Sequence, residues 1–210
     1  MGILDHTIGE EIVLKLVQIH HAEEIFQCVV KNRDHLKRYV PFAETTKEVT
    51  DTEQFIRHAL EQFSLGKEIH IGIWYQLRFA GMVGANQINT ALGFAEIGYW
   101  LAQDAQGKGV MTRSVLSLMD YLFVERKLNR IEIRCAVSNQ ASQAIPKRLC
   151  FQLEGKLRQM TQTSQGLEDV YVYGLLKKEW EQAKEHDYWQ YFRNENANRW
   201  KILERDSRRS

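Results

Sequence analysis

The chain has 210 residues, enough for one large domain or a domain with an appendage, and its 44% hydrophobic and 26% charged content is typical of a soluble globular protein. Lys and Arg number 28 against 27 Asp and Glu, and the net charge of +1 gives no electrostatic basis for a nucleic-acid or membrane partner. There is no apolar run of membrane-spanning length and no signal-like start, so we expect a cytoplasmic protein.

The N-terminal third alternates between strand and helix patterns. Ile12 to Val17 is rich in β-branched residues and predicts a first strand. Ala22 to Val30 follows as a helix, with Ile25, Cys28 and Val29 on one face. The polar stretch that comes next remains compatible with a helix until Val40-Pro41 interrupts it.

A second helix is predicted between Thr50 and Gly66. Thr50-x-x-Glu53 has the spacing of a capping box, in which two side chains pair with free backbone N–H groups at a helix start. Gly66 suits the residue just after a helix end. Helical spacing places four side chains on the buried face: Phe55, Ala59, Leu60 and Phe63.

From Ile69 onward the pattern changes to a period of two residues, which is typical of strands. Ile69, Ile71 and Ile73 alternate with more polar or smaller residues, and a turn near Leu77-Arg78 leads into a second strand from Phe79 to Ile88. Ala95 to Leu101 has few polar residues and predicts a central strand of the same sheet.

A glycine-rich loop, Gln106 to Thr112, connects that strand to a helix predicted from Met111 to Arg126. A helix start leaves backbone N–H groups unpaired, with the positive end of the helix dipole behind them, so this loop suits an anion such as phosphate. Its spacing fits neither a Walker A loop nor a dinucleotide-binding loop. On this motif alone, a glycine-rich turn without a ligand remains equally compatible.

The last third of the sequence predicts a strand from Ile131 to Val137 and a short helix capped by Ser138-Asn139 and interrupted by Pro146. Two further strands follow, Phe151 to Leu157 and Val170 to Leu176. The three cysteines, Cys28, Cys135 and Cys150, are odd in number and widely spaced, so neither a disulfide framework nor a metal site is expected.

Residues 179–210 differ in composition from residues 1–178, and we interpret them as a charged, helical C-terminal extension. Tyr188, Phe192 and Trp200 could form an apolar stripe on it. One hypothesis is a solvated tail. The other is docking on the same chain or on a second copy, which would make the protein a homodimer.

Four stretches together resemble the GNAT superfamily of acetyl-coenzyme A-dependent N-acetyltransferases, in its RimJ/RimL-type branch. They are Tyr39-Val40-Pro41-Phe42, Glu96-Ile97-Gly98-Tyr99-Trp100-Leu101, the glycine loop, and Asn139-Gln140-Ala141-Ser142 leading to Leu149-Cys150-Phe151 and Leu153-Glu154-Gly155. The resemblance covers about residues 10 to 178. It implies an α+β, three-layer fold with a mixed, mostly antiparallel sheet that splays open in the middle and is flanked by helices.

The resemblance also implies that acetyl-coenzyme A, as co-substrate, lies in that opening. Its pantetheine arm would pair with the strand near Trp100 and Leu101, and Asn139 would reach it from the other side. Its diphosphate would lie on the loop residues Gln106, Gly107, Lys108, Gly109, Val110, Met111 and Thr112. This chain departs from the wider superfamily pattern in having Met111 as the second small loop residue and Cys150 before the phenylalanine.

The third departure concerns catalysis, because Pro146 occupies the position where many members have a tyrosine as general acid. Ser142, one helical turn earlier, is the nearest residue that could hydrogen-bond the leaving sulfur. Glu96 and Glu154 are the candidate bases for the acceptor amine, and the alternative for each is a strand glutamate in a surface ion pair. A covalent route through Cys135 is conceivable, but no histidine in these motifs is placed to activate it.

The resemblance favours transfer of acetyl directly to a protein N-terminal α-amino group, with a ribosomal protein as one candidate acceptor. A small-molecule amine, such as a polyamine or an antibiotic, is the alternative acceptor. A non-catalytic acyl-coenzyme A-binding module is the alternative of a different class, and Pro146 is the residue that supports it.

Overall fold

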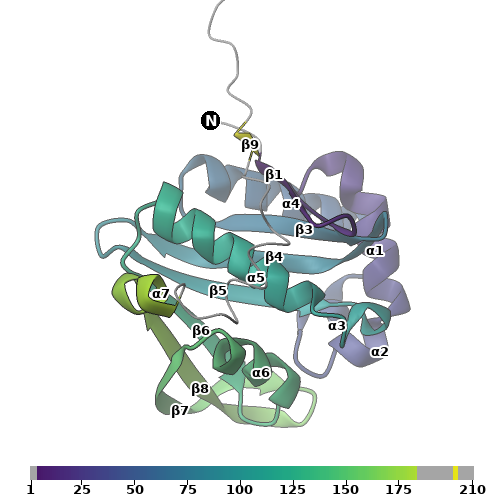
Figure 1. Ribbon diagram of the computed structural model, residues 1–210. Helices are drawn as coiled ribbons and strands as arrows, with labels where there is room; N and C mark the ends of the chain where they lie inside the picture. Colours follow the sequence, from purple (N-terminus) through teal and green to yellow (C-terminus); the bar gives the residue numbers. More distant parts are fainter. Residues whose placement is uncertain (1–3, 184–200, 203–210) are drawn as a thin grey trace, which may run out of the picture.

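The computed structural model describes residues 4–183 and 201–202 (Figure 1). In this part of the chain one sheet of nine strands has the order β7-β8-β6-β5-β4-β3-β2-β1-β9. The strands are β1 (Leu4–Ile8), β2 (Ile12–Leu16), β3 (Ile69–Tyr75), β4 (Arg78–Asn89), β5 (Phe94–Leu101), β6 (Arg130–Ala136), β7 (Gln152–Thr163), β8 (Gly166–Leu176) and β9 (Lys201–Ile202). The helices are α1 (Ala22–Lys31), α2 (Arg33–Leu36), α3 (Phe42–Thr45), α4 (Val49–Ser64), α5 (Val110–Asp120), α6 (Gln140–Arg148) and α7 (Lys177–Ala183).

The sheet carries helices on both faces, as expected. In Figure 1, α5 crosses the nearer face, and α1 and α4 lie farther from the viewer. Met82 and Val83 are neighbours on β4, and because strand side chains alternate in direction they enter two different cores. Val83 packs with the α5 side, and Met82 packs with α1 and α4. The fold is therefore α+β, with three layers.

The predicted splay lies between β5 and β6, which form the one parallel pair in the described sheet. Their pairing covers four residue pairs, from Phe94 opposite Arg130 to Ile97 opposite Ile133. In the described structure no register is shared beyond Ile97, although β5 stays paired with β4 as far as Leu101. The second half of β5 therefore presents one free backbone edge toward the opening.

Several local predictions were confirmed. Gln76 and Leu77 form the two-residue turn between β3 and β4, with φ of 49° and 66°, the left-handed values that such a hairpin requires. Gly66 follows α4 with φ of 70°, a conformation that costs glycine little. Asn139 caps α6, since its side chain accepts a hydrogen bond from the Ser142 backbone N–H at 3.0 Å.

The predicted start of α4 was wrong by two residues. Glu48 is the cap and forms the capping box with Asp51, so Thr50 lies inside the first turn. The buried face shifts accordingly, because Ile56 is fully buried whereas Phe55 remains 37% exposed. Both Thr50-x-x-Glu53 and Glu48-x-x-Asp51 place a carboxylate three residues after a polar side chain, and sequence spacing does not distinguish them.

Two further boundaries differ from prediction. β1 precedes the strand that we expected to be first. Its alternation is obscured in sequence because the polar His6 is on the buried side with Ile8. The helix expected as far as Arg126 changes geometry after Asp120, where Tyr121–Glu125 (η3) continues as a π-helical turn. A π-turn shifts the buried side by about one residue, which brings Tyr121, Leu122 and Phe123 all into the core.

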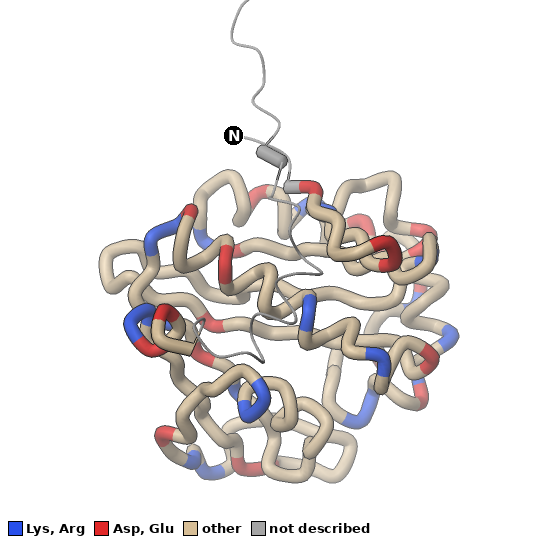
Figure 2. The backbone as a smooth tube through the Cα atoms, in the orientation of Figure 1, with Lys and Arg blue, Asp and Glu red and all other residues tan. Residues whose placement is uncertain are grey.

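The domain and its proposed extension are joined without a break. α7 crosses the expected boundary after residue 178, and its Trp180 is 1% exposed and stacks on Phe123 with ring centres 4.9 Å apart. Tyr188, Phe192 and Trp200 lie outside the described residues, so the docking stripe and the homodimer remain predictions. Lys, Arg, Asp and Glu are interspersed along the described backbone (Figure 2). No helix among the described residues is long and apolar enough to cross a membrane.

Candidate active site

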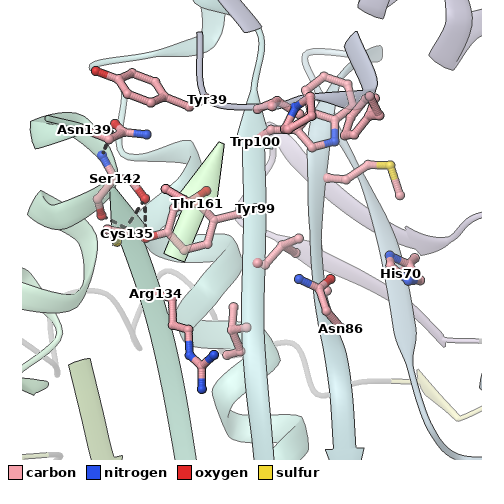
Figure 3. Close-up of a pocket in the computed structure, with 18 of the residues that line it drawn as sticks. Tyr39, His70, Asn86, Tyr99, Trp100, Arg134, Cys135, Asn139, Ser142 and Thr161 are labelled. Carbon is pink, nitrogen blue, oxygen red and sulfur yellow. Dashed lines mark hydrogen bonds between the residues drawn. The ribbon is translucent and has the colours of Figure 1, made fainter. Parts of the chain in front are cut away.

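Two cavities meet where β5 and β6 separate. We call the cavity beside residues 106–112, of 570 Å³, the loop cavity. The cavity on the other side of β5, of 580 Å³, is named the strand cavity. Six residues line both: Tyr39, Val40, Tyr99, Trp100, Asn139 and Ser142. A ligand in one cavity and a ligand in the other would therefore meet at these residues, which we call the shared wall. Figure 3 labels five of them: Tyr39, Tyr99, Trp100, Asn139 and Ser142.

The loop cavity is formed by the glycine-rich segment and the start of α5. Gly107 and Gly109 have φ of 72° and 73°, and a Cβ atom at Gly107 would meet nothing within 4 Å. Internal packing therefore leaves room for a side chain at Gly107, and the left-handed backbone is what favours glycine there. The first-turn N–H groups of α5 have no partner within the helix, so the cavity wall is a donor surface suited to phosphate oxygens.

Two side chains from other elements add to this surface. Arg148, from α6, lines the loop cavity and donates to the Thr112 hydroxyl at 2.9 Å. His35 also lines it, and its Nε2 atom lies 2.8 Å from the Gln106 side-chain nitrogen. A guanidinium beside a helix start strengthens the case for an anionic ligand. The sequence pattern did not single out Arg148 or His35, because both are distant from the loop along the chain.

Nine of the ten residues expected to hold acetyl-coenzyme A line the loop cavity: Trp100, Leu101, Gln106, Gly107, Gly109, Val110, Met111, Thr112 and Asn139. Lys108 is the exception. Its ammonium group lies 5.2 Å from the centre of the Tyr75 ring. This cation–π contact directs the side chain to β3, so the Lys108 charge does not face the cavity in this conformation.

The strand cavity is lined by side chains from many elements. His70 of β3, Asn86 of β4, Arg134 of β6 and Thr161 of β7 lie around it (Figure 3). Glu96 of β5 also lines it. These are hydrogen-bonding and ionisable groups, whereas the shared wall supplies aromatic surface. The combination suits an amine-bearing molecule with a polar body.

Glu96 is the candidate base that lines a cavity. Its carboxylate lies 3.4 Å from the Arg134 Nε atom, which also donates to Glu132 at 2.7 Å. Burial raises the pKa of Glu96 because a charged carboxylate loses solvation there, and Arg134 opposes that shift. A carboxyl with a raised pKa is a stronger base when ionised, which suits proton removal from an ammonium group.

Glu154, the other candidate base, lies elsewhere. It lines neither cavity, and Arg130 donates to both of its carboxylate oxygens. That ion pair lowers the pKa of Glu154. Since a carboxylate held in this way is a poor proton acceptor, the geometry favours Glu96 over Glu154.

Ser142 lies in the shared wall, within a cluster of three side chains. Its Oγ atom is 3.2 Å from the Cys135 Sγ atom and 3.4 Å from the Tyr99 hydroxyl. The Tyr99 hydroxyl in turn donates to the Ser142 backbone carbonyl at 2.8 Å. Pro146 is buried in α6 and lines neither cavity. Ser142 is thus the hydroxyl of α6 that a ligand in either cavity could contact.

Burial also affects the other two members of this cluster. It raises the pKa of the Cys135 thiol, and it holds the pKa of Tyr99 well above its ordinary value. Both groups are therefore protonated near neutral pH. A protonated Cys135 is a poor nucleophile, so the structure does not favour the covalent route through it. Within the described residues no cluster of three or more His, Cys, Asp or Glu side chains could hold a metal ion.

Comparisons with known proteins agree with this geometry. Residues 11–152 match the family described as the acetyltransferase (GNAT) domain. The putative ribosomal N-acetyltransferase YdaF of Bacillus subtilis is 33% identical over 178 residues, which cover 84% of this chain and 97% of that protein.

Two solved structures also resemble this one. A RimL ribosomal L7/L12 α-N-protein acetyltransferase in complex with coenzyme A is 27% identical, with a TM-score of 0.79, over 82% of this chain and 97% of that one. The microcin C7 self-immunity acetyltransferase MccE, in complex with acetyl-CoA and AMP, is 26% identical, with a TM-score of 0.76, over 80% of this chain and 94% of that one.

Proposed function

The chain belongs to the GNAT acetyltransferase family and uses acetyl-coenzyme A as its co-substrate, and we propose that it transfers the acetyl group to the N-terminal α-amino group of a protein. The observation that carries direct transfer from the cofactor to the acceptor is the junction of the two cavities at Tyr99 and Ser142. A thioester in the loop cavity and an amine in the strand cavity could react there without a covalent enzyme intermediate.

The loop residues would bind the diphosphate, and the free edge of β5 would bind the pantetheine arm. An extended amide chain can pair with a strand edge through main-chain hydrogen bonds, as in strand addition. The splay exposes that edge from Gly98 to Leu101. Acetyl-coenzyme A supplies an activated carbonyl at the junction, and a β5 backbone N–H near Leu101 would stabilise the oxyanion that forms when the amine attacks.

Glu96 would act as the base. An ammonium group has no lone pair, so Glu96 must accept a proton from the acceptor, directly or through a water molecule, before nitrogen attacks. The new bond joins nitrogen to the acetyl carbon, the bond that breaks is carbon to sulfur, and the attacking nitrogen releases one further proton to water as the amide forms. The electron pair of the broken bond remains on sulfur, where the Ser142 hydroxyl would stabilise the thiolate by a hydrogen bond.

Support for a protein acceptor comes from the similar proteins named above, two of which are described as ribosomal acetyltransferases. A small-molecule acceptor is the second candidate, and the similarity to MccE, whose structure holds AMP beside acetyl-CoA, favours it. The polar groups of the strand cavity, including His70 and Asn86, are compatible with either acceptor.

A panel of acceptors distinguishes these functions. Release of free thiol from acetyl-coenzyme A would be measured with short peptides that have a free N-terminus, with spermidine, with an aminoglycoside and with an aminoacyl-nucleotide analogue. The matched control is each peptide with a blocked N-terminus and a free lysine. We expect turnover with free-N-terminus peptides, and mass spectrometry should place the acetyl group on the α-nitrogen. Turnover confined to the small amines, or acetylation of lysine alone, would contradict the proposal.

A further inference from the structure

One set of hydrogen-bond directions satisfies the three contacts around Ser142 together. The Ser142 backbone carbonyl can accept but not donate, so the hydrogen of the Tyr99 hydroxyl, 2.8 Å away, is committed to it. The oxygen of Tyr99 then has only acceptor capacity left. In its 3.4 Å contact with the Ser142 hydroxyl, serine must therefore be the donor.

The same reasoning fixes the third contact. Because the hydroxyl hydrogen of Ser142 lies on Tyr99, it is not available to Cys135, whose sulfur is 3.2 Å from the serine oxygen. In that set of directions the thiol is the donor to the serine oxygen. Burial raises the pKa of Cys135 and keeps this hydrogen on sulfur. The chain of donors runs from Cys135 to Ser142 to Tyr99 and ends on the α6 backbone.

The three hydrogen bonds differ in how easily the donor can change to another acceptor. The bond from Tyr99 to the carbonyl has a short, ordinary length, whereas the bond from Ser142 to Tyr99 is long at 3.4 Å. A negatively charged sulfur in the shared wall is a better acceptor than a neutral phenol. Of the three hydrogen bonds, the one donated by the Ser142 hydroxyl is therefore the one that would switch its acceptor from Tyr99 to the leaving thiolate.

We propose that Cys135 and Tyr99 are positioning residues that hold the Ser142 oxygen from behind and direct its hydrogen toward the leaving sulfur. Cys135 donates a hydrogen bond to the serine oxygen. Tyr99 donates to the α6 backbone, and it accepts the Ser142 hydroxyl hydrogen until the leaving sulfur is present. No proton is transferred within the cluster. This inference rests on the role proposed above for Ser142.

The test combines single and double variants with the acceptor that gives turnover. Cys135→Ala should lower kcat about three- to tenfold, the effect of one weak neutral hydrogen bond, with the acetyl-coenzyme A KM unchanged. Cys135→Ser keeps a donor at that position and should restore kcat to within about twofold of the parent. Cys150→Ala is the matched control, because Cys150 is exposed and lines neither cavity, and it should leave kcat unchanged.

The double variant separates positioning from packing. In the Ser142→Ala background Cys135→Ala should cause no further loss, because the hydroxyl that it directs is absent. A loss of the same size in both backgrounds would overturn the inference and assign Cys135 to packing. If Ser142→Ala alone leaves kcat unchanged, the proposed role of Ser142 fails first. If Ser142→Ala lowers kcat and Cys135→Ala does not, only the positioning inference fails.

Tyr99→Phe provides an independent check if a Cys135 variant does not fold. It removes the hydroxyl and keeps the ring, so we expect about a tenfold loss in kcat with the acetyl-coenzyme A KM unchanged. Thermal melting should show each variant folded. An unchanged kcat in folded Tyr99→Phe would also overturn the inference.

Discussion

The loop cavity and the strand cavity have almost equal volumes, 570 and 580 Å³, but they are built differently. The loop cavity is lined by one continuous segment, residues 106–112 except Lys108, whose backbone is the proposed binding surface for the diphosphate. The strand cavity includes polar side chains from β3, β4, β5, β6 and β7, and these side chains are the proposed binding surface for the acceptor. A backbone site can serve one ligand shared by a family, whereas a side-chain site can change with each acceptor.

This difference leads to separable effects. Changes in the strand cavity and the shared wall should act on turnover and on the acceptor, and changes in the loop cavity should act on acetyl-coenzyme A affinity.

Glu96→Gln should lower kcat about a hundred- to ten-thousandfold, the usual contribution of a general base, because the amide cannot accept the proton. Acetyl-coenzyme A affinity, measured by calorimetry, should change little. In the parent protein the base works only when ionised, so activity should fall as pH falls through the raised pKa of Glu96. Glu154→Gln is the matched control on the same sheet. If Glu154→Gln proves the more damaging change, Glu96 is not the base.

Ser142→Ala should lower kcat about ten- to a thousandfold, since the departing sulfur loses its hydrogen-bond donor. Ser142 lines both cavities, but its contribution is confined to the reaction itself, so the acetyl-coenzyme A Kd should remain unchanged. Steady-state kinetics and calorimetry on the same preparation give both values. An unchanged kcat would reassign stabilisation of the thiolate to water or to another side chain.

Gly107→Ala should weaken acetyl-coenzyme A binding about tenfold. At φ of 72° an alanine costs about 1–2 kcal/mol, and its Cβ atom would project from the surface that a phosphate must approach. Gly155→Ala is the control, because Gly155 lies outside both cavities and a Cβ atom there meets nothing within 4 Å. Calorimetry that finds equal affinity in a folded Gly107→Ala protein would remove the loop from the binding site.

Arg134→Met should have the smallest effect, a displacement of the pH profile. Arg134 lowers the pKa of Glu96 against the effect of burial, so its removal should raise that pKa further. The loss of activity on acidification should then begin at a higher pH than in the parent protein. A pH–kcat/KM profile measures this directly. A profile that moves toward lower pH would contradict the pairing of Arg134 with Glu96.

The two cavities also differ in how far sequence predicts them. Gly107 and Gly109 indicate the loop in the sequence, because its left-handed backbone favours glycine. Nine of the ten residues expected at the cofactor site line the loop cavity. Lys108 does not line it, because its ammonium group lies over the ring of Tyr75, which is distant along the chain. Glu96 and Glu154 were both candidate bases in sequence, and the structure places Glu96 beside the strand cavity and Glu154 in an ion pair with Arg130.

The same limit applies to the fold. Strand alternation and glycine positions predicted most elements, since these signals depend on neighbours in the chain. The α4 cap was wrong because two overlapping spacings satisfy the same local rule. The cluster of Tyr99, Cys135 and Ser142 was not predictable, because its contacts join three elements. Features that depend on neighbouring residues can therefore be predicted from the sequence, whereas contacts between distant elements require the structure.

The most direct test of the shared wall is the affinity of a bisubstrate conjugate. Its coenzyme A sulfur would be joined through an acetyl linker to the α-nitrogen of an acceptor peptide, and its Kd would be compared with that of coenzyme A alone by calorimetry. If the two cavities meet at Tyr99 and Ser142, both halves can bind at once, and the conjugate should bind about a hundredfold or more tightly than coenzyme A. A conjugate that binds no more tightly than coenzyme A would contradict transfer across this wall.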